Sequence, residues 1–306
     1  MKSWIGRFGL LIALVTICAV LAFAKPVFLT LPNLINVVRQ ISINGILAVG
    51  VTYVLLTGGV DLSLGSLVAL TGVIAAHFAH PQQCPVIVPV VMGVASGALC
   101  GAVNGVVVTK GRVAPFIVTL GMMTAARGLA LVISEGKPVS NLSRDFTAIA
   151  GDLGRVPIPA VIFAAVALVS YLFLTNLRLG RYIYAVGGNE NAALASGISV
   201  TAVKMTAYSA CGALAGLAGV VLASRITTGQ PNAGVGYELD AIAAVVIGGT
   251  SLAGGVGSVG GTILGALLMG VINNGLDLLN VSFYYQAIVK GIIIVGAVWM
   301  DKGQEK

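Results

Sequence analysis

Charged side chains are scarce in this sequence. Lysine, arginine, aspartate and glutamate together make up 9% of the 306 residues, whereas an ordinary soluble domain carries about 25%. This deficit excludes a soluble globular fold. Hydrophobic residues account for 58%, which excludes intrinsic disorder, because disordered chains combine low hydrophobicity with high charge. The composition therefore indicates a protein that lies almost entirely in a membrane.

The residues that build common active sites are also few. The two histidines, His77 and His80, lie beside one turn, and the four cysteines form no CxxC pair, so no metal site is predicted. The one Gly-Lys pair, Gly136-Lys137, is followed by proline, where a phosphate-binding P-loop needs serine or threonine. We therefore predict a transporter subunit rather than an enzyme, with no catalytic residue and no cofactor bound by this chain.

Long apolar runs fill most of the chain instead. A membrane-spanning helix needs about 20 apolar residues, and short polar or proline-containing turns separate the runs. We predict an all-α integral membrane protein with about ten transmembrane helices in one permease domain, residues 1–306. The predicted spans are 8–24, 41–57, 62–79, 86–108, 114–133, 158–175, 204–223, 238–252, 256–276 and 285–300.

Basic residues indicate the orientation of these spans. Those at the two chain ends and in the predicted loops 110–112 and 176–203 slightly outnumber those in the opposite loops, and basic loops stay in the cytoplasm. The N- and C-termini are therefore predicted to be cytoplasmic. The net charge of +7 is scattered through the loops and forms no basic stripe, so no nucleic-acid partner is predicted.

Glycine is abundant, with 41 residues, and much of it is regularly spaced. Every fourth residue is glycine over 93–105 and over 257–265, and Gly212 and Gly216 have the same spacing. This period places the glycines on one face of a helix, where neighbouring backbones can approach closely. We therefore expect a tightly packed bundle.

A short internal repeat is also present. Residues 56–62 (LTGGVDL) resemble residues 246–252 (VIGGTSL), and an Asn-Gly pair follows in each half, at Asn104 and Asn274. Transporters are often built from two related halves with the transport path between them. We therefore expect two weakly related halves, each with a Gly-Gly break at the end of a helix.

Polar side chains at membrane depth are candidates for the transport path, because amides and hydroxyls both donate and accept hydrogen bonds. Each has a structural alternative. Asp61 can cap the following helix, as Glu238 and Asp240 can at a later span, and asparagines can join neighbouring helices. The candidate pathway residues are Asp61, Ser63, Asn44, Asn104, Asn273 and Asn274.

Two basic residues, Arg127 and Lys290, lie deeper in predicted spans. Either can extend to the membrane surface or pair with an acid in the bundle. No span carries a run of ionisable groups, which argues against a proton-driven pump, because such pumps need a relay of carboxylates. The pattern favours a conduit for a neutral polar solute that takes its energy from elsewhere.

The polar segment 176–203 contains the signature of a short helix. Asn189 is a good N-cap, Glu190 favours the positive end of a helix, and Gly197 is a typical stop. Arg178 and Arg181 precede it. Such a helix is either a connector or a docking element for a cytosolic partner.

Three segments resemble the sugar permeases of bacterial ABC importers. They are 179–190 (LGRYIYAVGGNE), 56–66 (LTGGVDLSLGS) and 236–255 (GYELDAIAAVVIGGTSLAGG). The resemblance covers essentially the whole chain. Residues 273–276 and 284–290 resemble the ribose-transporting members of the family, so the resemblance implies a permease for a monosaccharide, with ribose expected.

The resemblance also implies an assembly in the bacterial inner membrane, surrounded by lipid. Two copies of the chain would form a homodimer with the path at their interface. A periplasmic sugar-binding protein would deliver the sugar, and a cytosolic ATPase would bind ATP and Mg and power transport. The implied ATPase-coupling residues are Arg181, Asn189, Glu190, Asn191, Ala192, Ala193, Leu194, Ser196 and Gly197.

Alternatives remain open at this stage. Residues 256–259 (VGSV) replace a more basic segment expected in ribose permeases. Another sugar or a furanone signal is therefore an alternative substrate. An ion-coupled secondary transporter would work without an ATPase. The absence of an intramembrane acid relay from the sequence counts against it.

Overall fold

The computed structural model of the chain describes residues 2–81 and 84–302. Two 3-10 helices, η1 (Pro26–Leu29) and η2 (Ala148–Ala150), and two short strands, β1 (Asp152–Leu153) and β2 (Val156–Pro157), accompany the α-helices. The α-helices are α1 (Lys2–Ala24), α2 (Leu31–Leu56), α3 (Leu64–Phe78), α4 (Ile87–Thr109), α5 (Pro115–Ile133), α6 (Arg144–Thr147), α7 (Ile158–Asn176), α8 (Arg178–Gly188), α9 (Glu190–Ala195), α10 (Val200–Ile226), α11 (Tyr237–Ile247), α12 (Val259–Leu278) and α13 (Phe283–Lys302).

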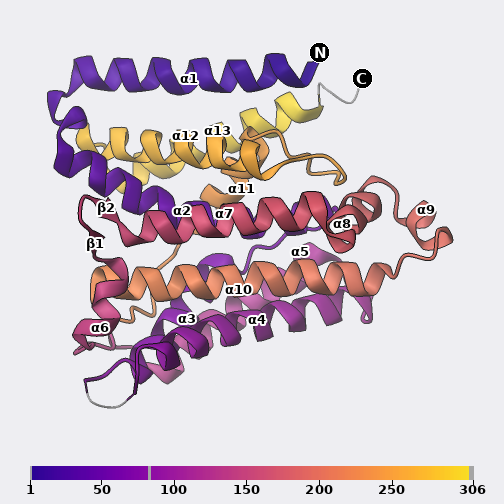
Figure 1. The fold of residues 1–306 in the computed structure, drawn as a ribbon, viewed down its shortest axis with the longest axis horizontal. Coiled ribbons are helices and arrows are strands. Elements are labelled where there is room, and N and C mark those ends of the chain that lie inside the picture. Colours follow the sequence, from indigo (N-terminus) through magenta and orange to yellow (C-terminus); the bar gives the residue numbers. More distant parts are fainter. Residues whose placement is uncertain (1, 82–83, 303–306) are drawn as a thin grey trace.

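The long helices lie side by side in one bundle (Figure 1). α10 runs through its middle and packs on α2, α3 and α4. The small elements α6, β1 and β2 lie at one end, here called the α6 end, and α8 and α9 lie at the other, the α9 end (Figure 1). α1 begins and α13 ends on the side of the α9 end (Figure 1).

Six helices are long and apolar enough to cross a membrane: α2, α4, α5, α7, α10 and α12. Shorter apolar segments lie in α1, α3 and α13, and α11 has only 11 residues. The helices thus overlap every predicted apolar run. The structure supports a mostly helical membrane protein.

The start of α2 differs most from the prediction. α2 begins at Leu31 rather than at residue 41, because its polar first turns are stabilised by contacts that hydropathy does not register. Asn33 bonds to Asn274, and Arg225 donates to Asn36 at 2.8 Å. Arg39 forms an ion pair with Asp152 at 2.6 Å.

The connections also contain more structure than expected. The connection between the predicted spans 114–133 and 158–175 holds α6, η2 and the antiparallel pair β1–β2. The segment 176–203 holds two helices, because α8 precedes α9. Side-chain caps begin α9 at Asn189, α10 at Ser199 and α12 at Ser258, each accepting from a backbone N–H in the first turn.

The spaced glycines allow close helix contact as predicted. A Cβ added at Gly97 or Gly101 of α4 would collide with the backbone of α10, and one added at Gly212 or Gly216 would collide with α4. The prediction is wrong for Gly257, which lies in the turn before α12 rather than on the helix. A chain reversal at 248–258 interrupts the four-residue period there.

Candidate translocation site and coupling surface

The predicted coupling helix is α9, which protrudes from the bundle (Figure 1). The Asn189 side chain accepts from the N–H of Ala192 at 2.9 Å, and Gly197, with φ +80°, follows the helix. Both predicted boundary signals are therefore confirmed. Leu194 exposes 63% of its surface while Ala193 is buried, so the helix shows an apolar tip to its surroundings.

The other predicted coupling residues lie on α9, at its two ends or, for Arg181, on α8. Most are exposed, and Glu190 accepts from the Lys204 ammonium at 2.6 Å. This ion pair joins α9 to the first turns of α10. The exposed members of the predicted set are Arg181, Asn189, Glu190, Asn191, Ala192, Leu194, Ser196 and Gly197.

α8 touches the turn between α11 and α12. The Tyr184 hydroxyl donates to the Gly257 carbonyl at 3.1 Å, and burial raises the pKa of this phenol. A Cβ at Gly187 would collide with the Leu56 carbonyl and the Gly255 nitrogen, and that Gly255 N–H donates to Leu56 at 3.0 Å. We name Leu56, Tyr184, Gly187, Gly255 and Gly257 the glycine joint. Sequence reasoning missed it, because three distant segments form it.

The two repeated Gly-Gly segments meet beside this joint. A Cβ at Gly58 would lie 3.3 Å from the Ala253 carbonyl. Gly58 has φ +75°, and Gly249, Gly254 and Gly255 also have positive φ, a conformation that favours glycine. The Gly-Gly breaks seen in the sequence are therefore real chain reversals at the α9 end.

Three candidate pathway residues form one buried group, the Asp61 cluster: Asp61, Ser63 and Asn104. Asp61 Oδ1 accepts from the Ser63 N–H at 2.8 Å and from its hydroxyl at 2.6 Å. Asn104 donates to the Ser63 hydroxyl at 3.3 Å. Asp61 thus fixes Ser63, the residue directly before α3, while Ser63 itself makes no side-chain capping bond to the helix. Asp61 Oδ2 and Asn104 Oδ1 receive no hydrogen bond from the described residues.

A second buried group, the Asp240 cluster, contains Asp240, Asn273 and Lys290. Asp240 Oδ2 accepts from the Lys290 ammonium at 2.8 Å and from the Asn273 amide at 3.2 Å. The predicted alternative that Lys290 pairs with an acid is confirmed. Asp240 Oδ1 and Asn273 Oδ1 have no partner within the described chain.

The clusters lie at opposite depths of the bundle. Asn104 precedes the end of α4 at Thr109, which puts it about 8 Å from the α9 end at a rise of 1.5 Å per residue. Asn273 precedes the end of α12 at Leu278, about 8 Å from the α6 end by the same rise. Each end of the bundle thus has a carboxylate and an amide nearby.

The remaining candidates lie elsewhere. Asn274 and Asn33 exchange two amide hydrogen bonds, of 3.1 and 2.9 Å, which supports helix joining. Asn44 is half-buried within α2. Arg127 donates to the carbonyls of Pro231 and Ala233 at 2.6 and 2.8 Å, so it holds the coil that precedes α11.

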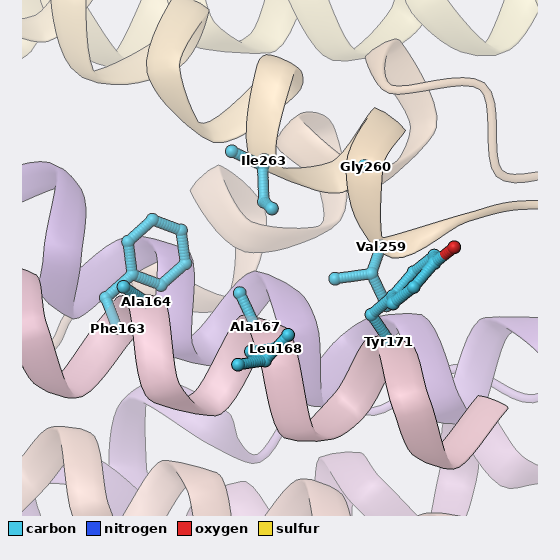
Figure 2. Close-up of a pocket in the computed structure, with 8 residues that line it drawn as sticks. All are labelled: Phe163, Ala164, Ala167, Leu168, Tyr171, Val259, Gly260 and Ile263. Carbon is cyan, nitrogen blue, oxygen red and sulfur yellow. The ribbon is translucent and has the colours of Figure 1, made fainter. Parts of the chain in front are cut away.

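An apolar groove of about 380 Å³ separates α7 from α12 (Figure 2). Its side chains offer almost no hydrogen-bonding surface, so it does not suit a hydroxyl-rich solute. The residues that line it are Phe163, Ala164, Ala167, Leu168, Tyr171, Val259, Gly260 and Ile263.

Comparison with known proteins shows the family to which this chain belongs. The family described as branched-chain amino acid transport system / permease component matches residues 33–298. The ribose import permease protein RbsC of Escherichia coli K12 is 48% identical over 99% of this chain and 96% of its own length.

Less similar relatives are also named as sugar permeases. RbsC of Bacillus subtilis is 46% identical over 97% of this chain and 92% of its own length. The D-allose transport system permease protein AlsC of Escherichia coli is 38% identical over 97% of this chain and 91% of its own length. No solved structure matches. The chain is thus a multi-pass membrane protein that belongs to the permease-component family of the branched-chain amino acid transport system.

Proposed function

We propose that this chain is the transmembrane permease subunit of an ABC importer that carries ribose across the bacterial inner membrane. The observation that carries the proposal is near-full-length similarity to ribose import permeases of two bacteria, at 48% and 46% identity. Identity falls to 38% for the allose permease and 37% for an arabinose permease, which favours ribose over those sugars.

The proposed topology has ten spans in a single domain, residues 1–306, with both termini in the cytoplasm. The short helices α3 and α11 count as spans because irregular segments extend them. The α9 end is then cytoplasmic and the α6 end periplasmic. The placement of the start of α1 and the end of α13 on the α9 side supports this orientation (Figure 1).

In this proposal a separate cytosolic ATPase binds ATP and Mg and powers transport, while this chain binds no cofactor. α9 docks on that ATPase through Leu194 and its exposed neighbours. The protrusion of α9 and its ion pair to α10 support this role. A helix that is fixed to its neighbour transmits a displacement better than a flexible loop does.

The proposed complex also contains a second copy of this chain and a periplasmic sugar-binding protein. ATP binding shifts the permease between two states that open to opposite sides. The Asp61 and Asp240 clusters lie on the proposed path, near its two ends. Asn44 is a weaker candidate, and the mutual bonds of Asn274 with Asn33 favour helix packing over a place on the path.

Uptake of [14C]ribose in a strain without its own ribose importer tests the function. The chain is expressed alone, with the ATPase, with the binding protein, and with both. Uptake only in the complete system is the expected result. Uptake by the chain alone would favour an ion-coupled transporter, and uptake of allose or arabinose but not ribose would redirect the proposal to those sugars.

A further inference from the structure

The Asp240 cluster has hydrogen-bonding capacity that its members do not use. The side chains of Asp240 and Lys290 are 4% and 22% exposed. Asp240 Oδ2 receives both internal hydrogen bonds, while Asp240 Oδ1 and Asn273 Oδ1 receive none from the described residues. Lys290 uses one of its three N–H donors on Asp240.

This pattern differs from that of a packing contact. Buried polar atoms in folded proteins nearly always have partners, and each exception needs an explanation. The neighbouring residue shows the contrast, because Asn274 and Asn33 satisfy each other with two hydrogen bonds. Two unpartnered acceptors on side chains that touch each other indicate a donor that comes from outside the chain.

The chemistry of the cluster selects the kind of ligand. Asp240 balances the charge of Lys290, so neither a cation nor an anion gains a net attraction. The free groups are two acceptor oxygens and the remaining N–H donors of an ammonium. Each hydroxyl donates one hydrogen bond and accepts up to two, so a pair of adjacent hydroxyls complements this set.

We propose that the Asp240 cluster is a binding station for two adjacent hydroxyls of the transported sugar. It lies near the α6 end, where α11, α12 and α13 each contribute one residue. The Lys290 side chain is partly exposed, while the two free acceptor oxygens are buried. The inference rests on the proposed function and adds the residues that bind the sugar hydroxyls.

The test measures selectivity in proteoliposomes that contain the permease, its ATPase and its binding protein. Initial uptake rates are compared for ribose, 2-deoxyribose and 3-deoxyribose. The variant Asn273→Leu removes the amide and leaves the ion pair intact. Its preference for ribose over at least one deoxy sugar is expected to fall by about threefold to tenfold, the effect of one hydrogen bond.

A structural role would lower all three rates equally and leave their ratios unchanged. The matched control is the double variant Asn33→Leu/Asn274→Leu, which removes an amide pair that satisfies itself. It is expected to keep the wild-type ratios at any overall rate. The binding protein is the same throughout, so its own selectivity cancels when variant and wild type are compared.

A second variant, Asp240→Asn/Lys290→Gln, removes both buried charges and keeps a hydrogen-bonded pair, so it covers the case in which Asn273→Leu does not fold. It is also expected to lose selectivity. Wild-type ratios in either folded variant would overturn the station. A wild-type complex that takes up no ribose would instead contradict the proposed function and remove the basis for the station.

Discussion

Glu190 and Lys204 form an ion pair of 2.6 Å that joins α9 to α10. The Glu190 side chain is 54% exposed and that of Lys204 is 17% exposed. An exposed pair contributes about 0–1 kcal/mol to the free energy of unfolding. The pair therefore adds little to stability, and its importance depends on the proposed coupling role of α9.

Glu190→Gln combined with Asn191→Ala is expected to uncouple ATP hydrolysis from uptake. The change removes the ion pair and one exposed contact of α9, so ATPase motion is no longer passed to α10. The ratio of sugar transported to ATP hydrolysed should fall while the dimer still assembles. Lys204→Met, which leaves the α9 surface unaltered, is expected to lower the same ratio. Wild-type ratios in both variants would rule out this link.

Gly187→Ala is expected to destabilise the protein, because the added Cβ collides with Leu56 and Gly255 in the glycine joint. Overpacking of this kind costs about 1–3 kcal/mol. Gly188→Ala is the matched control, since a Cβ there meets nothing within 4 Å. Thermal unfolding in detergent compares the two, and equal melting temperatures would contradict the tight packing of the joint.

Lys290→Met is expected to lower the free energy of unfolding by about 3–5 kcal/mol, because it leaves the buried Asp240 carboxylate without its cation. Adding Asp240→Asn should restore most of the loss, because the buried charge is then gone. Denaturation of the single and double variants checks this. A double variant as unstable as the single one would show that charge pairing is not the cause.

Asp61→Ala is expected to destabilise the start of α3 by about 1–3 kcal/mol, since the Ser63 N–H and hydroxyl lose their acceptor. Asp61→Asn keeps an acceptor oxygen for Ser63 and should retain near-wild-type stability. Melting temperatures decide between them. If Asp61→Asn is as unstable as Asp61→Ala, the negative charge rather than the hydrogen bonds to Ser63 is what this segment requires.

Part of the site follows from local sequence signals. Asn189, Glu190 and Gly197 mark the limits of α9 because caps and stops act within one helical turn. The Asp61–Ser63 contact is equally local, since the two residues are two positions apart. By contrast, the glycine joint combines segments from α2, α8 and the turn before α12, and no local pattern connects them.

The membrane class, the position of the apolar helices and the glycine faces of α4 and α10 were determined by the sequence itself, whereas the pairing of those two faces appears only in the structure. Hydropathy sums over about 20 residues, and a four-residue glycine period defines a helix face without reference to neighbours. Tertiary structure decided the pairing of the polar residues. Asn273 bonds to Asp240 and Asn274 to Asn33, although they are adjacent asparagines in one helix. Helix rotation and packing direct the two side chains to different neighbours, and that geometry exists only in the folded bundle.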